Sequence, residues 1–207
     1  MPIFTKNDVS VFFSHIPKTG GSSAERFLVS NGYRMSFTSR GIEPCSLQHR
    51  HNKDPELLAE LLKVKPIYKF TIIRHPVDRA ISKFFNTRES RLHQITTSED
   101  FHNWVTSTLE KYKTNNFVAD NHIRPQVEFL HEGIDIYTFG QWDKLCDGLA
   151  NHCEINTKYF PHVHKGTSNT TSSDFCKDVL NWTPKEKTIE ILKDFYKEDF
   201  KLFFSIV

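Results

Sequence analysis

A short apolar run that leads through a glycine-containing loop into a helix constrains the fold of this 207-residue chain most. The segment Val9–Ser14 reads VSVFFS, and such a β-branched and aromatic run is typical of a buried strand. The loop PKTGGSS follows it, and the apolar spacing from Ser22 onward predicts a helix with Ser22 or Ser23 as its N-cap. A strand, a glycine loop and a helix N-terminus in this order can bind an anion.

The same alternation of strands and helices continues along the chain. A helix at 54–62 is expected to bury one stripe formed by Leu57, Leu58, Leu61 and Leu62. The remaining predicted elements are strands at Ile67–Arg74 and Ile134–Phe139, and helices from Pro76, around Phe101–Lys113, at Trp142–Leu149 and at Pro184–Phe204. This order predicts a three-layer α/β fold with a mainly parallel central sheet flanked by helices, in a single domain spanning residues 1–207. The strand exits at Ser14 and Arg74 are then expected to open toward the same edge of the sheet, where ligands of such folds gather.

Composition narrows the class of protein further. The net charge of +2 and the pI near 8.3 are too mild to indicate a nucleic-acid partner. The four cysteines form no CxxC pair, so we expect free, mostly buried thiols. No signal peptide or transmembrane segment is recognisable, which predicts a cytoplasmic protein unless the sequence is a trimmed part of a lumenal enzyme.

The loop after the first strand has the groups that a phosphate needs. Adjacent glycines let the backbone turn tightly and approach a ligand, and amides at a helix N-terminus favour an anion. The lysine stands before the glycines, whereas in the common nucleotide loop G-x-x-x-x-G-K-[ST] it stands after them. A plain turn with an exposed lysine is the alternative. The expected phosphate contacts are Lys18, Thr19, Gly20, Gly21, Ser22 and Ser23.

A second candidate anion site, RHPVDRAIS, begins at the other strand exit. Arg74 stands at the strand end, and Arg79 and Ser82 lie three residues apart on one helical face. A guanidinium and a hydroxyl so placed can hold one phosphate between them. The alternative is that Arg74 pairs with a carboxylate such as Asp78 and that Arg79 is a solvated surface charge. Two such motifs at paired strand exits indicate an anionic ligand more strongly than either alone.

HIPKTGGSS followed by FTIIRHPVDRAISKFF resembles the sulfotransferases that use 3′-phosphoadenosine 5′-phosphosulfate (PAPS). The branch most similar to it contains heparan sulfate 2-O-sulfotransferase and the Golgi carbohydrate sulfotransferases. The resemblance implies that the loop from Lys18 to Ser23 holds the 5′-phosphosulfate, and that Arg74 and Ser82, with Arg79 as a weaker candidate, hold the 3′-phosphate. YFPHVHKGTS resembles the family's nucleotide-covering loop, which adds Lys165 and Thr167 as candidate donor contacts.

The resemblance also implies the chemistry. A hydroxyl of the acceptor attacks sulfur in line, adenosine 3′,5′-bisphosphate leaves, and Lys18 stabilises the charge on the leaving oxygen without a metal. His49 or His51, at the histidine spacing of the 2-O-sulfotransferase branch, is expected to act as the general base, with a slight preference for His49. Zinc bound by these histidines is the disfavoured alternative, because the chain has no tight cysteine or histidine quartet.

The resulting hypothesis is a PAPS-dependent sulfotransferase that acts on a hydroxyl of a carbohydrate or glycoconjugate. A nucleotide-dependent kinase is one alternative, although the lysine order and the lack of a clear Mg²⁺-binding acidic strand end argue against it. A non-catalytic module that binds PAPS or a sulfated glycan is the other alternative. The sequence predicts neither the acceptor nor the oligomeric state.

Overall fold

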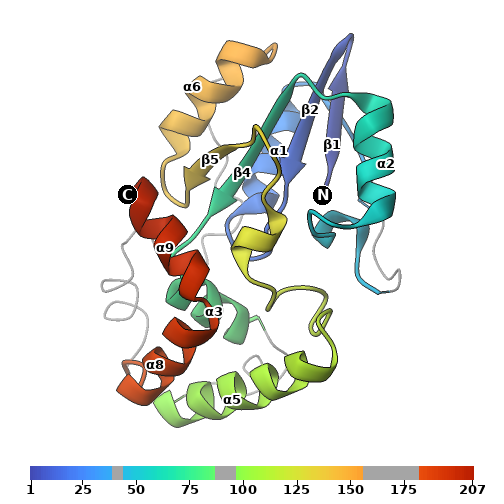
Figure 1. Cartoon of the computed structure of the whole chain (residues 1–207). Helices are drawn as coiled ribbons and strands as arrows, with labels where there is room; N and C mark the ends of the chain where they lie inside the picture. Colours follow the sequence, from blue (N-terminus) through green and yellow to red (C-terminus); the bar gives the residue numbers. More distant parts are fainter. Residues whose placement is uncertain (39–43, 87–96, 156–181) are drawn as a thin grey trace. The chain divides into compact units, whose positions relative to one another are not determined.

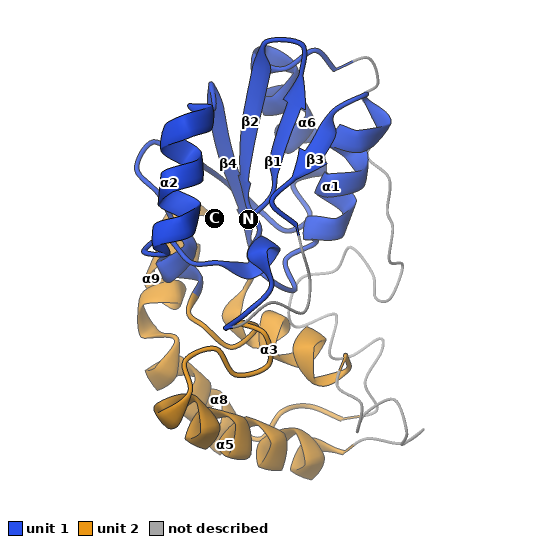
Figure 2. Cartoon of the chain, turned by 90° about the vertical axis from the view of Figure 1, so that its right-hand side faces the viewer, with its two compact units in different colours: residues 1–73, 126–164 blue, residues 74–125, 165–207 orange. Residues whose placement is uncertain are grey.

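The computed structural model describes residues 1–38, 44–86, 97–155 and 182–207. The chain forms two compact units, each built from two separate stretches (Figure 2). Unit 1 comprises Met1–Ile73 and Gln126–His164, and unit 2 comprises Arg74–Pro125 and Lys165–Val207. The chain therefore passes directly from the last residue of a strand in unit 1 into unit 2, with no linker between them.

Unit 1 contains a five-stranded sheet in the order β3-β1-β2-β4-β5 (Figure 1). Strands β2, β4 and β5 run parallel, whereas β1 pairs antiparallel with both β2 and β3. The predicted α/β fold is confirmed, and the sheet is mixed because β1 and β3 add an antiparallel edge that the sequence analysis did not anticipate. The strands are β1 (Ile3–Lys6), β2 (Val9–Ser14), β3 (Arg34–Ser36), β4 (Tyr68–Ile73) and β5 (Asp135–Thr138).

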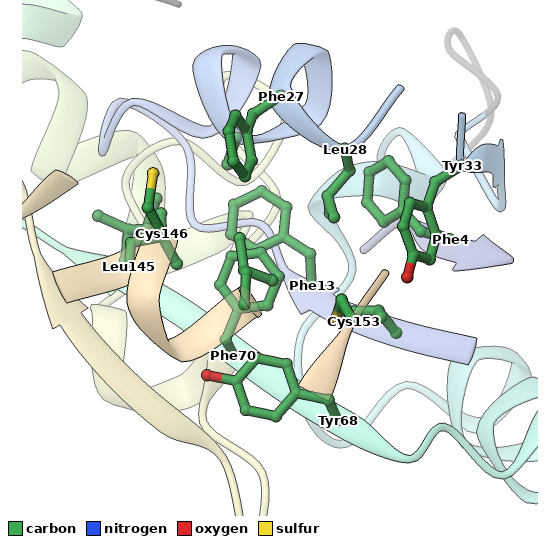
Figure 3. Packing of buried hydrophobic residues seen from close by; sticks show 14 of the residues in the cluster. Phe4, Phe13, Phe27, Leu28, Tyr33, Tyr68, Phe70, Leu145, Cys146 and Cys153 are labelled. Atoms are coloured by element: carbon green, nitrogen blue, oxygen red, sulfur yellow. The ribbon is translucent and has the colours of Figure 1, made fainter. Parts of the chain in front are cut away.

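Helices cover both faces of this sheet, with α2 on the side opposite α1 (Figure 2). On the α1 and α6 face, aromatic side chains of neighbouring strands stack, and the ring centroids of Phe13 and Phe70 lie 4.7 Å apart (Figure 3). Phe27 and Leu28 from α1 and Leu145 and Cys146 from α6 pack against these rings. The helical segments of unit 1 are α1 (Gly21–Ser30), η1 (Leu47–His49), α2 (Pro55–Val64), η2 (Gln126–Phe129) and α6 (Trp142–His152).

Two sequence predictions for unit 1 are wrong in detail. The N-cap of α1 is Gly20, with φ 90°, rather than Ser22 or Ser23, because the left-handed turn that starts the helix favours a residue without Cβ. In α2 only Leu57 is buried, whereas Leu58 is 40% and Leu62 is 75% exposed. The leucine spacing therefore predicted the helix correctly, but the prediction that all four leucines are buried is wrong. The three described cysteines, Cys45, Cys146 and Cys153, are buried thiols, as predicted.

Unit 2 is helical and has an aromatic core in which Phe84, Phe101, Trp104 and Trp182 pack together. Its helices are α3 (Pro76–Phe84), α5 (Ser98–Thr114), α8 (Glu186–Phe195) and α9 (Lys197–Ile206). The single helix predicted at Pro184–Phe204 is two helices that break at Tyr196, where φ is −99° and ψ is 27°. The buried Tyr196 hydroxyl donates to the Ile123 carbonyl at 2.7 Å, which holds the chain at this break. Among the described residues, no helix has the length and apolar character needed to cross a membrane.

Candidate active site

Parallel pairing brings the ends of β2 and β4 to one edge of the sheet, as predicted. Ser14 is aligned with Thr71, and the Thr71 hydroxyl donates to the Ser14 carbonyl at 2.8 Å. The Ser14 hydroxyl donates to the Phe129 carbonyl at 2.6 Å, which anchors the strand end to η2. Both segments singled out from the sequence, the loop after Ser14 and the arginine after Ile73, therefore start at this edge.

The loop between β2 and α1 is held in a conformation that few residues adopt. Lys18 has φ 71°, a left-handed conformation that is uncommon outside glycine and is frequently found at functional sites. Thr19 is fully buried, and its hydroxyl donates to the Ile16 carbonyl at 2.8 Å. The Thr19 hydroxyl therefore stabilises the loop from within, while Lys18 stays half-exposed beside it.

Both glycines are packed so closely that a side chain would clash. A Cβ on Gly20 would lie 2.7 Å from the Trp142 ring, and a Cβ on Gly21 would lie 2.4 Å from Nε2 of His15. Gly21 is also the first residue of α1, so its amide belongs to the helix N-terminus. The sequence requirement for two glycines thus comes from neighbouring rings as well as from backbone freedom.

The N-terminus of α1 differs from those of the other helices in its charge. The first turn of α1 contains no acidic residue, whereas the first turn of every other described α-helix contains at least one. A carboxylate in this position normally offsets the positive end of the helix dipole. The first turn of α1 therefore presents the amides of Gly21 and Ser22 and the Ser22 hydroxyl without a competing carboxylate in that turn, while the amide of the buried Ser23 donates to the Gly20 carbonyl at 3.0 Å.

His15 and Glu25 lie next to the loop, and the sequence analysis did not select them. The His15 Nδ1 lies 2.5 Å from a Glu25 carboxylate oxygen, and the side chains are only 7% and 13% exposed. Burial alone would raise the pKa of Glu25, but the hydrogen bond from His15 and the nearby His15 and His49 charges lower it overall. The only sequence signal was a histidine directly after the strand, because the two residues stand ten positions apart and form no motif.

The structure separates the two histidines proposed as general base. His49 ends η1 and is 6% exposed, and its ring lies 5.3 Å from the His15 ring in an edge-to-face arrangement. The Gln48 amide nitrogen lies 3.2 Å from Nε2 of His49. His51 is half-buried, and its Nδ1 accepts a hydrogen bond from the Lys53 amide at 3.1 Å. Of the two, His49 is therefore the one grouped with the loop through His15.

The second motif opens unit 2 and contains buried charges of both signs. Arg74 is 7% and Asp78 is 6% exposed. Burial raises the pKa of Asp78 to about 6, against the opposing charge of Arg74, and burial lowers the pKa of Arg74. The His75 Nδ1 and an Asp78 carboxylate oxygen lie 4.0 Å apart, and neither atom has a hydrogen-bond partner among the described residues.

Arg79 and Ser82 lie on α3 with different environments. Arg79 is 2% exposed, and its guanidinium donates to the carbonyls of Arg124 at 2.9 Å and His122 at 3.0 Å. It thereby fixes the segment that precedes η2, a structural contact that the solvated-charge alternative did not foresee. Ser82 is half-buried one turn later on the helix.

The remaining predicted contacts are not placed. Lys165 and Thr167 lie outside the described residues. The loop motif belongs to unit 1 and the arginine motif to unit 2. The assignment of all these residues to one donor site stays a prediction.

Comparison with known proteins adds one finding. The model of the sulfotransferase family matches residues 1–205, which is nearly the whole chain. No curated protein and no solved structure gave a significant match.

Proposed function

Because the chain belongs to the sulfotransferase family, we propose that it transfers the sulfuryl group of PAPS to an acceptor hydroxyl, with a carbohydrate or glycoconjugate as the acceptor. The observation that carries the proposal is the loop of residues 17–23, which ends at the one described α-helix whose first turn has no acidic residue. Family membership argues against the kinase alternative. A non-catalytic binding module stays open until turnover is measured.

In the proposed reaction, a lone pair of the acceptor oxygen forms a bond to sulfur. The bond from sulfur to the bridging oxygen of the 5′-phosphate breaks, and this oxygen leaves with the electron pair on adenosine 3′,5′-bisphosphate. Lys18 and the first amides of α1 stabilise the negative charge that grows there, so they lower the energy of the transition state more than that of the bound substrate. Arg74 and Ser82 are the proposed contacts of the 3′-phosphate.

We propose His49 as the base that takes the acceptor proton. Its burial, its position beside His15 and the contact of the His51 ring with its own turn all favour His49. General bases of this kind contribute about 10²–10⁴-fold to the rate.

Transfer of labelled sulfate from PAPS to a panel of polysaccharides, glycolipids and small alcohols tests the activity. Lys18→Ala should lower kcat/KM by about 10²-fold or more, while Lys63→Ala, which removes an exposed lysine of α2, should leave it unchanged. His49→Ala should abolish most turnover and His51→Ala should not. Normal turnover in Lys18→Ala would rule out the proposed loop chemistry, and equal losses in both histidine variants would contradict the choice of base.

Calorimetry tests the donor without requiring an acceptor. Adenosine 3′,5′-bisphosphate should bind at least about tenfold more tightly than AMP, because a charge-assisted hydrogen bond to a phosphate is worth about 1.5–3 kcal/mol. Arg74→Ala should remove this difference, and Arg34→Ala, at an exposed position of β3, should keep it. Equal affinities of the wild-type protein for the two nucleotides would exclude a 3′-phosphate clamp.

A further inference from the structure

The His15–Glu25 pair next to the loop has an arrangement that suits anion binding. Glu25 lies on α1, one turn after Gly21, and holds the Nδ1 side of the His15 ring at 2.5 Å. Because the Glu25 carboxyl has a lowered pKa, it is ionised near neutral pH and the shared proton belongs to Nδ1. This leaves Nε2 as the atom that can gain or lose a proton.

The Nε2 atom faces the N-terminus of α1. It is the atom nearest to the position where a Cβ of Gly21 would stand, at 2.4 Å, and no described residue forms a hydrogen bond with it. The His15 side chain is 7% exposed, so its ring is a buried polar group directed at the end of a helix that carries no acidic residue in its first turn. Nε2 itself is not among the fully buried unpaired atoms of the described residues, so this unbonded nitrogen keeps the access to solvent that a ligand at the helix end requires.

We propose that His15 is an additional donor to the anion bound at the α1 N-terminus, oriented by Glu25, and that anion binding takes up a proton at Nε2. The inference rests on the proposed nucleotide site and adds to it a contact residue outside the loop motif. When the anion binds, its negative charge favours the imidazolium form, and the Nε2–H group then donates to a phosphate or sulfate oxygen. The proton comes from solvent, so the affinity depends on pH.

Three titratable groups surround His15 and set the background for this titration. Glu25 of α1 favours the imidazolium form through its negative charge, whereas His49 of η1 and the N-terminal amine of Met1, which both act on the Glu25 carboxylate, disfavour it when they are charged. Arg50, next to His49, is paired with Asp54 at 2.7 Å. The proposed uptake must therefore be measured as a difference between variants rather than from wild-type protein alone.

Calorimetric titration with adenosine 3′,5′-bisphosphate, from pH 6 to 9 and in buffers that differ in ionisation enthalpy, measures the protons taken up. Wild-type protein should show an uptake that passes through a maximum in this range. His15→Gln should remove that maximum and weaken binding by on the order of tenfold at its pH, since a charge-assisted hydrogen bond is lost. Glu25→Gln should move the maximum to lower pH, because the imidazolium loses its carboxylate.

Matched controls separate this role from a general effect on folding. His152→Gln and Glu132→Gln change exposed residues of unit 1 and should leave the uptake curve unchanged. Identical uptake in wild-type protein and His15→Gln across the range, or an unmoved maximum in Glu25→Gln, would overturn the proposal.

A second measurement keeps the outcome distinct from that of the proposed function. Histidine nitrogen NMR with millimolar inorganic sulfate, which does not itself titrate near neutral pH, should raise the pKa of His15 and give its Nδ1-protonated tautomer in the neutral form. If adenosine 3′,5′-bisphosphate fails to bind but sulfate raises the pKa of His15, the nucleotide assignment is wrong and the anion contact stands. If sulfate leaves the His15 pKa unchanged, the anion contact is wrong.

Discussion

Asp78 is a buried carboxyl group whose protonation is linked to folding. Burial raises its pKa from 3.8 to about 6. Since the folded state holds the proton more tightly than the unfolded state, the stability from this group is fully present below about pH 3.8. It is lost as the pH rises through about 6. The ionised carboxylate therefore destabilises the native state at neutral pH.

We expect Asp78→Asn to increase the free energy of unfolding by about 1–3 kcal/mol at pH 7.5, since one pKa unit corresponds to about 1.4 kcal/mol. The gain should shrink at pH 4.5, where the wild-type carboxyl is protonated in the folded state. Urea unfolding at the two pH values measures the difference. Asp143→Asn, in the first turn of α6 but exposed, should instead lose a few tenths of a kcal/mol at pH 7.5.

The pH dependence of wild-type stability alone does not isolate the effect of Asp78, because protonation of His131 changes the free energy of unfolding in the opposite direction. The comparison with the Asp78→Asn variant is therefore needed. Burial and the charge of Lys69 lower the pKa of His131 to about 4. Its contribution to stability is therefore lost as the pH falls from about 6.5 toward about 4, while that of Asp78 is gained over a similar range. In the pH dependence of wild-type stability, these two contributions oppose each other and are not resolved separately. A destabilised Asp78→Asn at pH 7.5 would show that the carboxylate makes a favourable contact that outweighs its burial.

At the residue scale, the sequence allowed candidate site residues to be selected but did not reveal the local geometry that holds them. The candidate anion-binding loop of residues 17–23 could be selected because glycines, hydroxyls and a lysine cluster within seven positions. Its helix cap was misplaced, because serine preference does not reveal that the turn at Gly20 is left-handed and packed under Trp142. The His15–Glu25 pair was missed because it depends on a contact across one turn of a helix and a loop.

At the element scale, the approach of α6 to the sheet depends on one glycine. A Cβ on Gly148 would lie 1.8 Å from the Tyr137 hydroxyl of β5 and 3.1 Å from that of Tyr68 on β4. These two hydroxyls are hydrogen-bonded to each other at 2.7 Å. The helix can therefore rest on the tyrosine pair only where it has no side chain.

Gly148→Ala should consequently destabilise the protein by about 1–3 kcal/mol, the usual cost of overpacking. In an exposed helix the same change stabilises by up to about 1 kcal/mol, so the sign of the effect is diagnostic. Thermal or urea unfolding of Gly148→Ala, Tyr137→Phe and the double variant measures it. The double variant should recover part of the loss, because the atom nearest to the new methyl group is gone; a stabilised Gly148→Ala would contradict the packing.

Helices and strands could be predicted where a local sequence pattern determines them. They could not be predicted where contacts between distant residues determine them. The predicted strand at Val9–Ser14 matches β2 to the residue, since its apolar run is buried in the sheet. Strand β1 pairs with both β2 and β3, and the edge strand β3 has only three residues, of which two are exposed, so no apolar run marks it in the sequence. The break between α8 and α9 could not be predicted, because the Tyr196 hydroxyl bonds to Ile123, which is 73 positions away.

At the scale of the whole molecule, the stretches of the two units alternate along the chain, so the two units could unfold either together or separately. Each unit is made of two stretches of sequence, and the two stretches of one unit are separated in the chain by a stretch of the other unit. We propose, in line with the single domain expected from the sequence, that unfolding is one cooperative transition. The tryptophans allow a direct test, because Trp142 belongs to the core of unit 1, and Trp104 and Trp182 pack against the core of unit 2.

The Trp104→Phe/Trp182→Phe variant retains fluorescence from unit 1 alone, and Trp142→Phe retains it from unit 2 alone. In each variant, the urea midpoint from tryptophan fluorescence should coincide with the midpoint from far-ultraviolet circular dichroism, which reports helices of both units. Comparison within one variant removes the effect of the substitution on stability. If the two probes separate in either variant, the units unfold independently, and the pH and packing effects predicted above then belong to unit 2 for Asp78 and to unit 1 for Gly148.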